Sequence, residues 1–435
     1  MQHSSLKYLC AAATALIVVG CSSQSSNQTA TTDSPAGTPA SAAATPNAAA
    51  VTDVPALDRA GWTDSVYQTL TETIAASSGQ GKIVVFDFDN TTQARDVGEA
   101  MLARVQETNA IDPASLSTAM FPPFSTADGK PMAITDGIST YYDAVLDSAG
   151  DADPFREYSS LPLVATAFTG RTLSDFLAQT AGAYDNGAGA ADLESSEETS
   201  ILGAGRPFIY PQMADLYGNL RSHGYDVWVV SAGVTWAVRW MVQNAVNPAI
   251  VEKYGQEAAL PMDHVVAVTS LLKDRETGKL VSDYQLTHQT PDQAYIELDP
   301  ARMSQLEILA IPDGLASWRG GKAGAIDNVI SRGELFMVAG DSMGDVEMLA
   351  RANNRLVISR MNKPGLAEGF AAEIEKAPDA NWMLQPTINS APAGFLPTKC
   401  VMAEKTAGNA ELTTTTDKSL AILDATGKLG SFVTC

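Results

Sequence analysis

Residues 82–91, with the sequence KIVVFDFDNT, decide the fold class of this 435-residue chain. The run Ile83–Phe86 is continuously apolar, as is typical of a parallel strand buried on both faces. It brings Asp87 and Asp89 to the carboxyl end of that strand, which is where ligands bind in open α/β sheets. One carboxylate could attack phosphorus while the other handles the leaving-group proton. An Asp-x-Asp pair alone is also compatible with a solvated turn or a helix N-cap.

Later segments place further polar groups at comparable positions. A second apolar strand ends at Ser231, and a third leads into Asp341 and Asp345 within GDSMGD. Lys322 lies between them in GGKAG, ahead of a helical run. Each of these residues also has an ordinary interpretation, as a helix cap, a surface charge or a turn residue. Their occurrence in this order favours one shared site.

The four motifs resemble those of the haloacid dehalogenase superfamily, in its phosphatase branch, over about residues 80–365. The family pattern is Asp-x-Asp-x-Thr, a Ser or Thr, a Lys, and Gly-Asp-x-x-x-Asp. This chain supplies DFDNT, Ser231, Lys322 and GDSMGD in that order. The resemblance implies an α/β fold, a Rossmann-like doubly wound parallel sheet with a mainly helical cap inserted between the first and second motifs.

The resemblance also implies catalytic roles. Asp87 would be the nucleophile that forms an aspartyl-phosphate, and Asp89 would protonate the leaving oxygen and then activate water. Ser231 would donate to a phosphoryl oxygen, beside Ala232 and Gly233 as substrate-binding neighbours. Lys322 would neutralise the charge between the phosphoryl group and the nucleophile.

Mg²⁺ is the cofactor that the resemblance implies. It would be held by the Asp87 carboxylate, the Asp89 main-chain carbonyl and Asp341, with Asp345 supporting the cluster. Such an all-oxygen site is what Mg²⁺ requires. Thr91 would pin the loop after the first strand at the edge of the substrate site.

Two other chemistries are disfavoured by the histidines. GDSMG also matches the Gly-x-Ser-x-Gly elbow of α/β-hydrolases, but that order needs a His after the serine. All four histidines precede Ser342. The chain has no His-x-x-x-His or Cys-x-x-Cys pair for a tetrahedral zinc site.

The amino terminus predicts export. Residues 1–20 carry Lys7 and then an apolar stretch too short to span a membrane, as in a signal peptide. The sequence VVGC resembles a bacterial lipobox, which would leave Cys21 lipidated and anchor the protein to a membrane; a conventional signal peptide is the alternative. Residues 21–54 are rich in Ser, Thr, Ala and Pro, which predicts a disordered tether.

Two cysteines remain in the folded body, Cys400 and Cys435. In an exported protein such a pair indicates a disulfide. Closing this loop would stabilise the fold by about 3–4 kcal/mol on chain-entropy grounds. Two free buried thiols are the alternative.

The charge balance limits the partners. The chain has 28 basic and 50 acidic residues, a formal net charge of −22. Such a surface repels nucleic acid and anionic lipid head groups. We therefore expect a small phosphomonoester as partner, no nucleic acid, and membrane contact through the lipid anchor only.

The motif spacing predicts the domain layout. Asp87 and Ser231 are 144 residues apart, far more than one crossover helix needs. We expect core segments at 55–95 and 211–383, a cap at 96–210 and a carboxyl-terminal extension at 384–435 closed by the disulfide. Helices are expected at residues 96–108, 138–147, 172–180, 212–223 and 234–244, and further strands at 264–269 and 355–359. A polar loop is expected at residues 185–200 and a hairpin turn at 273–279.

Substrate identity depends on residues beyond the motifs. In the phosphoserine phosphatase-like branch, an acidic residue nine positions after the nucleophile grips the substrate ammonium. Here that position is Asp96, with Glu99 on the same helical face, although a helix start explains both acids equally well. Arg171 is an alternative contact for phosphate or carboxylate. The candidates for an aromatic wall around a cationic head group are Tyr141, Tyr142, Phe168 and Trp236.

These features predict an Mg²⁺-dependent phosphomonoesterase outside the cytoplasm. Exported relatives in this branch include phosphorylcholine phosphatases, which makes phosphorylcholine and phosphoserine candidate substrates. A broad-specificity acid phosphatase is one alternative. A surface-binding lipoprotein without turnover is an alternative of a different class.

Overall fold

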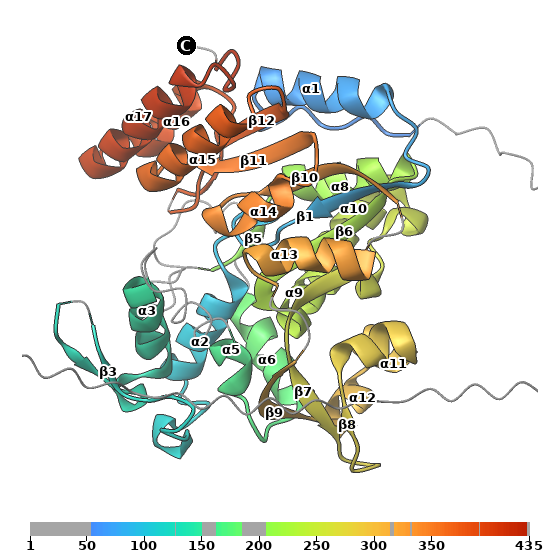
Figure 1. Ribbon diagram of the computed structural model, residues 1–435, viewed down its shortest axis with the longest axis vertical. Coiled ribbons are helices and arrows are strands. Elements are labelled where there is room, and N and C mark those ends of the chain that lie inside the picture. The colour runs from blue at the N-terminus through green and yellow to red at the C-terminus, as the bar shows by residue number, and fades with distance from the viewer. Residues whose placement is uncertain are drawn as a thin grey trace, which may run out of the picture. The chain divides into compact units, whose positions relative to one another are not determined.

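The apolar run at residues 83–86 lies in the middle of the sheet in the computed structural model (Figure 1). The structure describes residues 54–126, 128–149, 162–184, 206–313, 317–330, 333–390 and 392–432. Within these residues the main sheet has nine strands, eight of them in the order β13-β12-β11-β10-β1-β6-β7-β8, while β9 pairs with β7. The chain therefore has the predicted α/β fold.

Six neighbouring strands of this sheet run parallel. They are β12 (Asn381–Ile388), β11 (Asn354–Arg360), β10 (Glu334–Gly340), β1 (Lys82–Phe86), β6 (Asp226–Val234) and β7 (Val265–Asp274). Phe86, the last residue of β1, pairs with Ala339 on one side and with Val229 on the other. The carboxyl ends of β1, β10 and β6 therefore meet at one edge of the sheet.

Alternate residues of β1 belong to two separate cores, which explains the continuous apolar run. Val84 and Phe86 pack in the cluster that includes α1 (Asp64–Ala75) and α8 (Pro211–Ser222). Ile83 and Val85 pack in the cluster that includes α15 (Pro364–Lys376) and α17 (Ala410–Ala425). Each such side chain contributes about 1.5–3 kcal/mol by leaving water. Helices on both faces thus hold β1 at the centre.

Between β1 and β6 the chain is mainly helical. It forms α2 (Val97–Glu107), α3 (Ile138–Ala149), α5 (Leu163–Thr166) and α6 (Leu173–Tyr184), which Figure 1 shows grouped away from α15–α17, and a short hairpin of β3 (Phe124–Ser125) and β4 (Pro131–Met132). The entry to this segment, β2 (Gln93–Ala94), pairs antiparallel with its exit, β5 (Phe208–Ile209). The expected loop at 185–200 lies outside the described residues, and the cap boundaries stay a prediction.

The predicted hairpin at 273–279 is present. β7 turns back into β8 (Leu280–Val281), with Gly278 at a φ of +70°, and β9 (Leu306–Asp313) also pairs antiparallel with β7. A buried Arg239 on α9 (Thr235–Met241) donates to both oxygens of Asp283 at 2.6 and 3.1 Å. This ion pair ties the segment after the hairpin to the helix that follows Ser231.

The remaining helices complete the layers. They are α10 (Asn247–Tyr254), α11 (Gln293–Ile296), α12 (Pro300–Gln305), α13 (Gly320–Ala325), α14 (Val346–Leu349) and α16 (Lys399–Thr406). At the other sheet edge, β13 (Gly394–Phe395) pairs antiparallel with β12. β12 runs through the expected boundary at residue 383, so the sheet continues into the carboxyl-terminal segment.

Three expectations fall wholly or partly outside the described residues. Residues 1–53, which hold the signal peptide, Cys21 and most of the tether, are not described, and neither is Cys435. The lipid anchor and the Cys400–Cys435 disulfide therefore stay predictions. Of the helices in the described ranges, none combines the length and apolarity that crossing a bilayer needs.

Candidate active site

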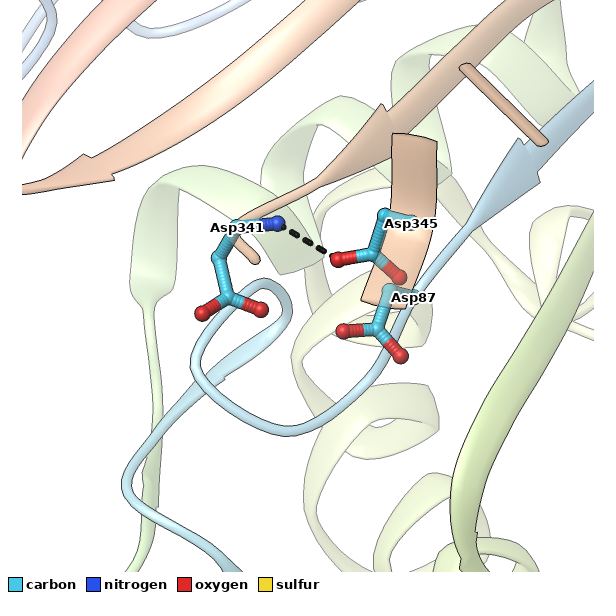
Figure 2. A group of neighbouring side chains, drawn as sticks. All are labelled: Asp87, Asp341 and Asp345. Atoms are coloured by element: carbon cyan, nitrogen blue, oxygen red, sulfur yellow. Dashed lines mark hydrogen bonds between the residues drawn. The ribbon is translucent and has the colours of Figure 1, made fainter. Parts of the chain in front are cut away.

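Three aspartates meet where β1 and β10 end. Figure 2 shows the carboxylates of Asp87, Asp341 and Asp345 side by side, and one oxygen from each lies within 4.8 Å of the others. Asp87 follows β1 directly, and its backbone N–H donates to Ala339 O at 2.9 Å, which extends the sheet pairing by one residue. Asp341 follows β10 in the same way. The parallel strands therefore deliver both acids to one point.

Lys322 is the cation within this cluster. Its Nζ donates to Asp87 Oδ1 at 2.6 Å and to Asp345 Oδ1 at 2.5 Å, and the residue is only 3% exposed. Burial alone lowers the pKa of a lysine, but Asp345 and Asp87 outweigh burial, so the pKa of Lys322 is raised. The ammonium therefore stays charged and fixes the orientation of two carboxylates at once.

Asp345 uses both of its oxygens within the protein. Oδ1 accepts from Lys322, while Oδ2 accepts from Asp341 N at 3.0 Å, Ser342 N at 3.0 Å and Ser342 Oγ at 3.1 Å. Asp345 is completely buried, and these donors compensate for its desolvation. Its role is therefore to hold the Asp341 backbone and Lys322 in place.

Asp87 Oδ2 and Asp341 Oδ1 are the oxygens best suited to a metal. The Thr91 hydroxyl lies 3.2 Å from each, and its single proton can serve only one of them at a time. Both are hard carboxylate oxygens, the kind of ligand that Mg²⁺ requires, and the Asp89 main-chain carbonyl is the further ligand that the sequence resemblance implies. The other oxygen of Asp341, Oδ2, forms an ion pair with Arg360 Nε at 2.7 Å, although the angles of this contact are not those of a hydrogen bond. The donor set fits the expected metal, with Asp345 as support.

The electrostatics of Asp87 also favour a bound cation. Burial, followed by the charge of Asp345, raises its pKa well above the ordinary value, and Lys322 opposes this only in part. A divalent cation at this cluster would keep the Asp87 carboxylate ionised and screen an incoming phosphate from it.

Asp89 has a different environment from Asp87. Gln93 Nε2 donates to its Oδ1 at 2.5 Å, and Val97 N donates to the same oxygen at 3.2 Å. Burial raises the pKa of Asp89 well above its ordinary value, and the charges of Asp96 and Asp87 add to this. Asp89 therefore tends to hold a proton, as a general acid must.

A tight loop places both acids. The backbone N–H groups of Thr91, Thr92 and Gln93 all donate to Phe88 O, at 2.7–3.2 Å. Thr92 Oγ1 also donates to Asp87 O at 2.8 Å. Asn90 adopts a positive φ of 58°, a conformation that asparagine tolerates better than most residues. The loop therefore turns back directly after Asp89.

These residues open onto a cavity of about 200 Å³. The lining consists of Asp87, Asp89, Asn90, Asp96, Gly98, Tyr142, Val164, Ser231, Ala232, Gly233, Val234, Trp318, Lys322, Asp341, Ser342, Gly344 and Arg360. Ser231 Oγ accepts from Gly233 N at 3.0 Å, which leaves its proton available to another acceptor. The residues of all four motifs thus surround one small polar space.

Asp96 fits both of the interpretations that the sequence allowed. It caps α2, because its Oδ1 accepts from Gly98 N at 2.6 Å and from Glu99 N at 3.0 Å, and it also lines the cavity. Glu99 is not among the described lining residues. Burial, then the charges of Asp96 and Asp143, raises the pKa of Glu99 to about 8.

Several other expected substrate contacts lie elsewhere. Of the four aromatic candidates, only Tyr142 lines the cavity within the described ranges. Trp236 and Phe168 pack edge-on against Phe176 in the core, and Trp236 Nε1 donates to Tyr295 OH at 2.8 Å. These two candidates are wrong, because both side chains are buried in core packing outside the cavity lining.

Three more expected contacts are also outside the lining. Tyr141 OH donates to Pro122 O at 2.8 Å. The Arg171 carbonyl lies beside β9, where it accepts a hydrogen bond from Ile308 N at 2.9 Å. Thr91 is fully buried behind the carboxylates, so it supports the loop instead of facing the cavity.

The lining residues that the sequence interpretation missed include Arg360, Trp318 and Asn90. A signal existed for Arg360, since it is the last residue of β11, and ligands in such sheets bind at the carboxyl ends of strands. Trp318 does not directly follow a strand, because β9 ends at Asp313, and no local pattern singled it out. Asn90 was part of the recognised motif, but its side-chain direction depends on the loop geometry.

Comparison with known proteins gives an independent view. No family model matches the chain. A phosphorylcholine phosphatase from Pseudomonas aeruginosa is 27% identical over 298 residues, which covers 68% of this chain and 78% of the relative. The chain is a homologue of a phosphatase.

The chain also aligns with solved structures. A protein of unknown function from Anaerococcus prevotii aligns with a TM-score of 0.49 and 20% identity over 79% of this chain and 97% of its own. A substrate-bound phosphoserine phosphatase aligns with a TM-score of 0.35 and 13% identity over 66% of this chain and 90% of its own.

Gly340 gives a test of the packing behind the carboxylates. A Cβ at this position would lie 2.5 Å from Asp345 Cβ, so Gly340→Ala must displace Asp345. We expect a loss of about 1–3 kcal/mol in the free energy of unfolding, measured with urea. Gly324→Ala on α13 is the control, since nothing lies within 4 Å of its Cβ. An equal response of the two variants would contradict the described packing.

Proposed function

We propose that this phosphoric monoester hydrolase depends on Mg²⁺ and acts through an aspartyl-phosphate on Asp87. The observation that carries the proposal is the placement of Asp87, held at 2.6 Å by Lys322, in the same small cavity as Asp89 and Ser231. The homologous phosphorylcholine phosphatase supports the activity class.

The protein side chains divide the work in a definite way. An Asp87 oxygen attacks phosphorus, and Lys322 and the Ser231 hydroxyl stabilise negative charge on the phosphoryl oxygens. Asp89 gives its proton to the leaving oxygen and, as a carboxylate, then takes a proton from the water that hydrolyses the acyl phosphate. Mg²⁺, when bound by Asp87, Asp341 and the Asp89 carbonyl, would supply charge screening at the phosphoryl group.

We further propose that the preferred substrates are small esters with a cationic or amino-bearing head group, such as phosphorylcholine. Asp96 and Tyr142 line the cavity. A substrate cation there would offset the cost of burying the Asp96 carboxylate, and an aromatic face attracts quaternary ammonium groups. A cavity of about 200 Å³ suits a small ester. The broad-specificity alternative predicts equal use of charged and uncharged esters.

Lipid anchoring outside the cytoplasm completes the proposal. It is supported by the apolar segment within residues 1–20, the lipobox-like VVGC and the polar composition of residues 22–54. A tether of this composition would let the enzyme reach small soluble esters while staying attached to the membrane.

The central experiment measures phosphate release by the purified protein with Mg²⁺ or with excess EDTA. We expect activity only with Mg²⁺, none for Asp87→Asn, and a loss of about 10²- to 10⁴-fold in kcat for Asp89→Asn. Asp327→Asn, an exposed acid that pairs with Arg351 outside the cavity lining, is the control and should retain full activity. Full activity in EDTA, or in Asp87→Asn, would refute the mechanism.

Asp96→Asn tests the substrate class, because asparagine preserves the helix cap but removes the charge. A contact of about 1–3 kcal/mol would raise KM for phosphorylcholine by about 5- to 150-fold. KM for p-nitrophenyl phosphate should change less than about 2-fold, since that ester lacks the cation.

The matched control for this test is Asp299→Asn, at another N-cap with two backbone donors outside the cavity lining. It should leave both KM values unchanged. Equal changes for both esters in Asp96→Asn would favour the broad-specificity alternative.

Cys21→Ser tests the anchor. Each lipid CH₂ in the bilayer contributes about 0.8 kcal/mol, so the variant should lose its partition into the detergent phase. The full-length wild-type protein, expressed in a bacterial host and fractionated in parallel, is the reference. Continued membrane association of the variant would show that Cys21 is not the anchor.

A further inference from the structure

Gln93 lies just beyond the DFDNTT motif, and the mechanism above gives it no role. Its side chain is completely buried, and its Nε2 donates to Asp89 Oδ1 at 2.5 Å. We infer that Gln93 is a positioning residue for Asp89, holding Oδ1 so that Oδ2 is the oxygen that exchanges a proton with the substrate. This inference rests on the proposed function.

Backbone contacts hold Gln93 in place in addition to its side-chain bond to Asp89. Its backbone N–H donates to Phe88 O at 3.1 Å, and the residue pairs with Ile209 across the β2–β5 ladder. The side-chain amide therefore starts from a backbone that is held on both sides. A rigid donor of this kind can orient a neighbouring carboxylate.

A second donor reaches the same oxygen of Asp89. Val97 is the first residue of α2, and its N–H donates to Oδ1 at 3.2 Å. The first N–H groups of a helix have no partner within the helix, so they are available to such an acceptor. Two elements, β2 and α2, thus converge on Oδ1 and leave Oδ2 for another purpose.

Oδ2 lies at the cavity wall that carries Ser231. A Cβ built on Gly233 would be 2.7 Å from Asp89 Oδ2, so this oxygen lies directly against the Gly233 backbone. Gly233 N in turn donates to Ser231 Oγ at 3.0 Å. Oδ2 therefore lies beside the segment proposed to bind the phosphoryl group.

The reaction assigns different tasks to the two oxygens. Asp87 forms a bond to phosphorus while the bond from phosphorus to the leaving oxygen breaks, and that electron pair stays on the leaving oxygen. Asp89 Oδ2 transfers its proton to this oxygen, so the product is a neutral alcohol and Asp89 becomes a carboxylate. Oδ1 accepts from Gln93 and Val97 before and after the transfer, so the side chain need not rotate.

One feature of Gln93 argues against a purely structural role. Its Oε1 is buried and has no hydrogen-bond partner within the described residues. An apolar side chain of the same size would avoid this unsatisfied oxygen. The amide is thus better explained by the donor that it presents to Asp89 than by packing.

The test compares leaving groups. Propyl phosphate releases a strongly basic alkoxide that needs the proton, whereas p-nitrophenyl phosphate releases a stable phenolate that does not. We expect Gln93→Leu to lower kcat/KM for propyl phosphate by about 10- to 100-fold, part of the 10²- to 10⁴-fold that general acid catalysis contributes. For p-nitrophenyl phosphate the expected loss is less than about 3-fold, because protonation contributes little.

The ratio of kcat/KM for propyl phosphate to kcat/KM for p-nitrophenyl phosphate is insensitive to partial misfolding, because inactive protein lowers both values equally. Gln93→Met provides a second apolar variant should the leucine variant fold poorly. In an Asp89→Asn background, Gln93→Leu should not change the ratio further, because its effect passes through Asp89.

The outcomes separate the two proposals. A wild-type protein inactive toward both esters would overturn the proposed function, and this inference with it. If the wild-type protein is active, two results would overturn the role of Gln93 alone. One is a ratio of the two kcat/KM values that Gln93→Leu does not change, and the other is a change of equal size in the wild-type and Asp89→Asn backgrounds.

Discussion

The contact of Lys322 with two buried carboxylates is the interaction on which the site depends. Asp87, Asp341 and Asp345 converge at one sheet edge, and isolated buried charges are costly unless they are paired. Lys322 joins Asp87 to Asp345, and Arg360 lies beside Asp341. Three acids and two bases leave one negative charge in excess. A divalent cation bound by this cluster would reverse the sign of the cluster's charge, which would favour a phosphate ester there despite the acidic character of the whole chain.

The two acids of the Asp-x-Asp pair acquire different roles from their surroundings. Burial raises the pKa of Asp87 as well, but the Lys322 ammonium at 2.6 Å opposes this in part, and a bound divalent cation would keep the Asp87 carboxylate ionised. Burial raises the pKa of Asp89, and the negative charges of Asp96 and Asp87 raise it further, so the protonated form of Asp89 is favoured. A sharp loop turns the two side chains into these environments. In the proposed mechanism these chemically identical groups, two positions apart, act as a nucleophile and a proton donor.

The sequence predicted the parts of the site whose placement depends on strand ends. Asp87 and Asp341 directly follow buried strands, while Ser231 lies within β6, which continues to Val234, and the parallel order of these strands brings the three residues together. Lys322 was recognised from motif order, since its helix gives no local sign of a buried ammonium. Arg360 ends β11, so the strand-end rule could have found it. The side-chain contact of Gln93 depends on loop geometry and on pairing between distant segments, such as Gln93 with Ile209, which local patterns do not encode. Trp236 and Phe168 were predicted to line the site but lie in the core, because the sequence alone does not distinguish an aromatic residue of a core from one of a binding wall.

The central claim is that Asp87 becomes covalently phosphorylated during turnover. Acid quenching of the enzyme during hydrolysis of a phosphate ester, followed by proteolysis and mass spectrometry, locates the phosphoryl group directly. The account predicts an acid-stable, hydroxylamine-sensitive acyl phosphate on the peptide that contains Asp87, and none on Ser231 or Ser342. Phosphate mapped to another residue, or active turnover with no phosphorylated enzyme at any quench time, would contradict it.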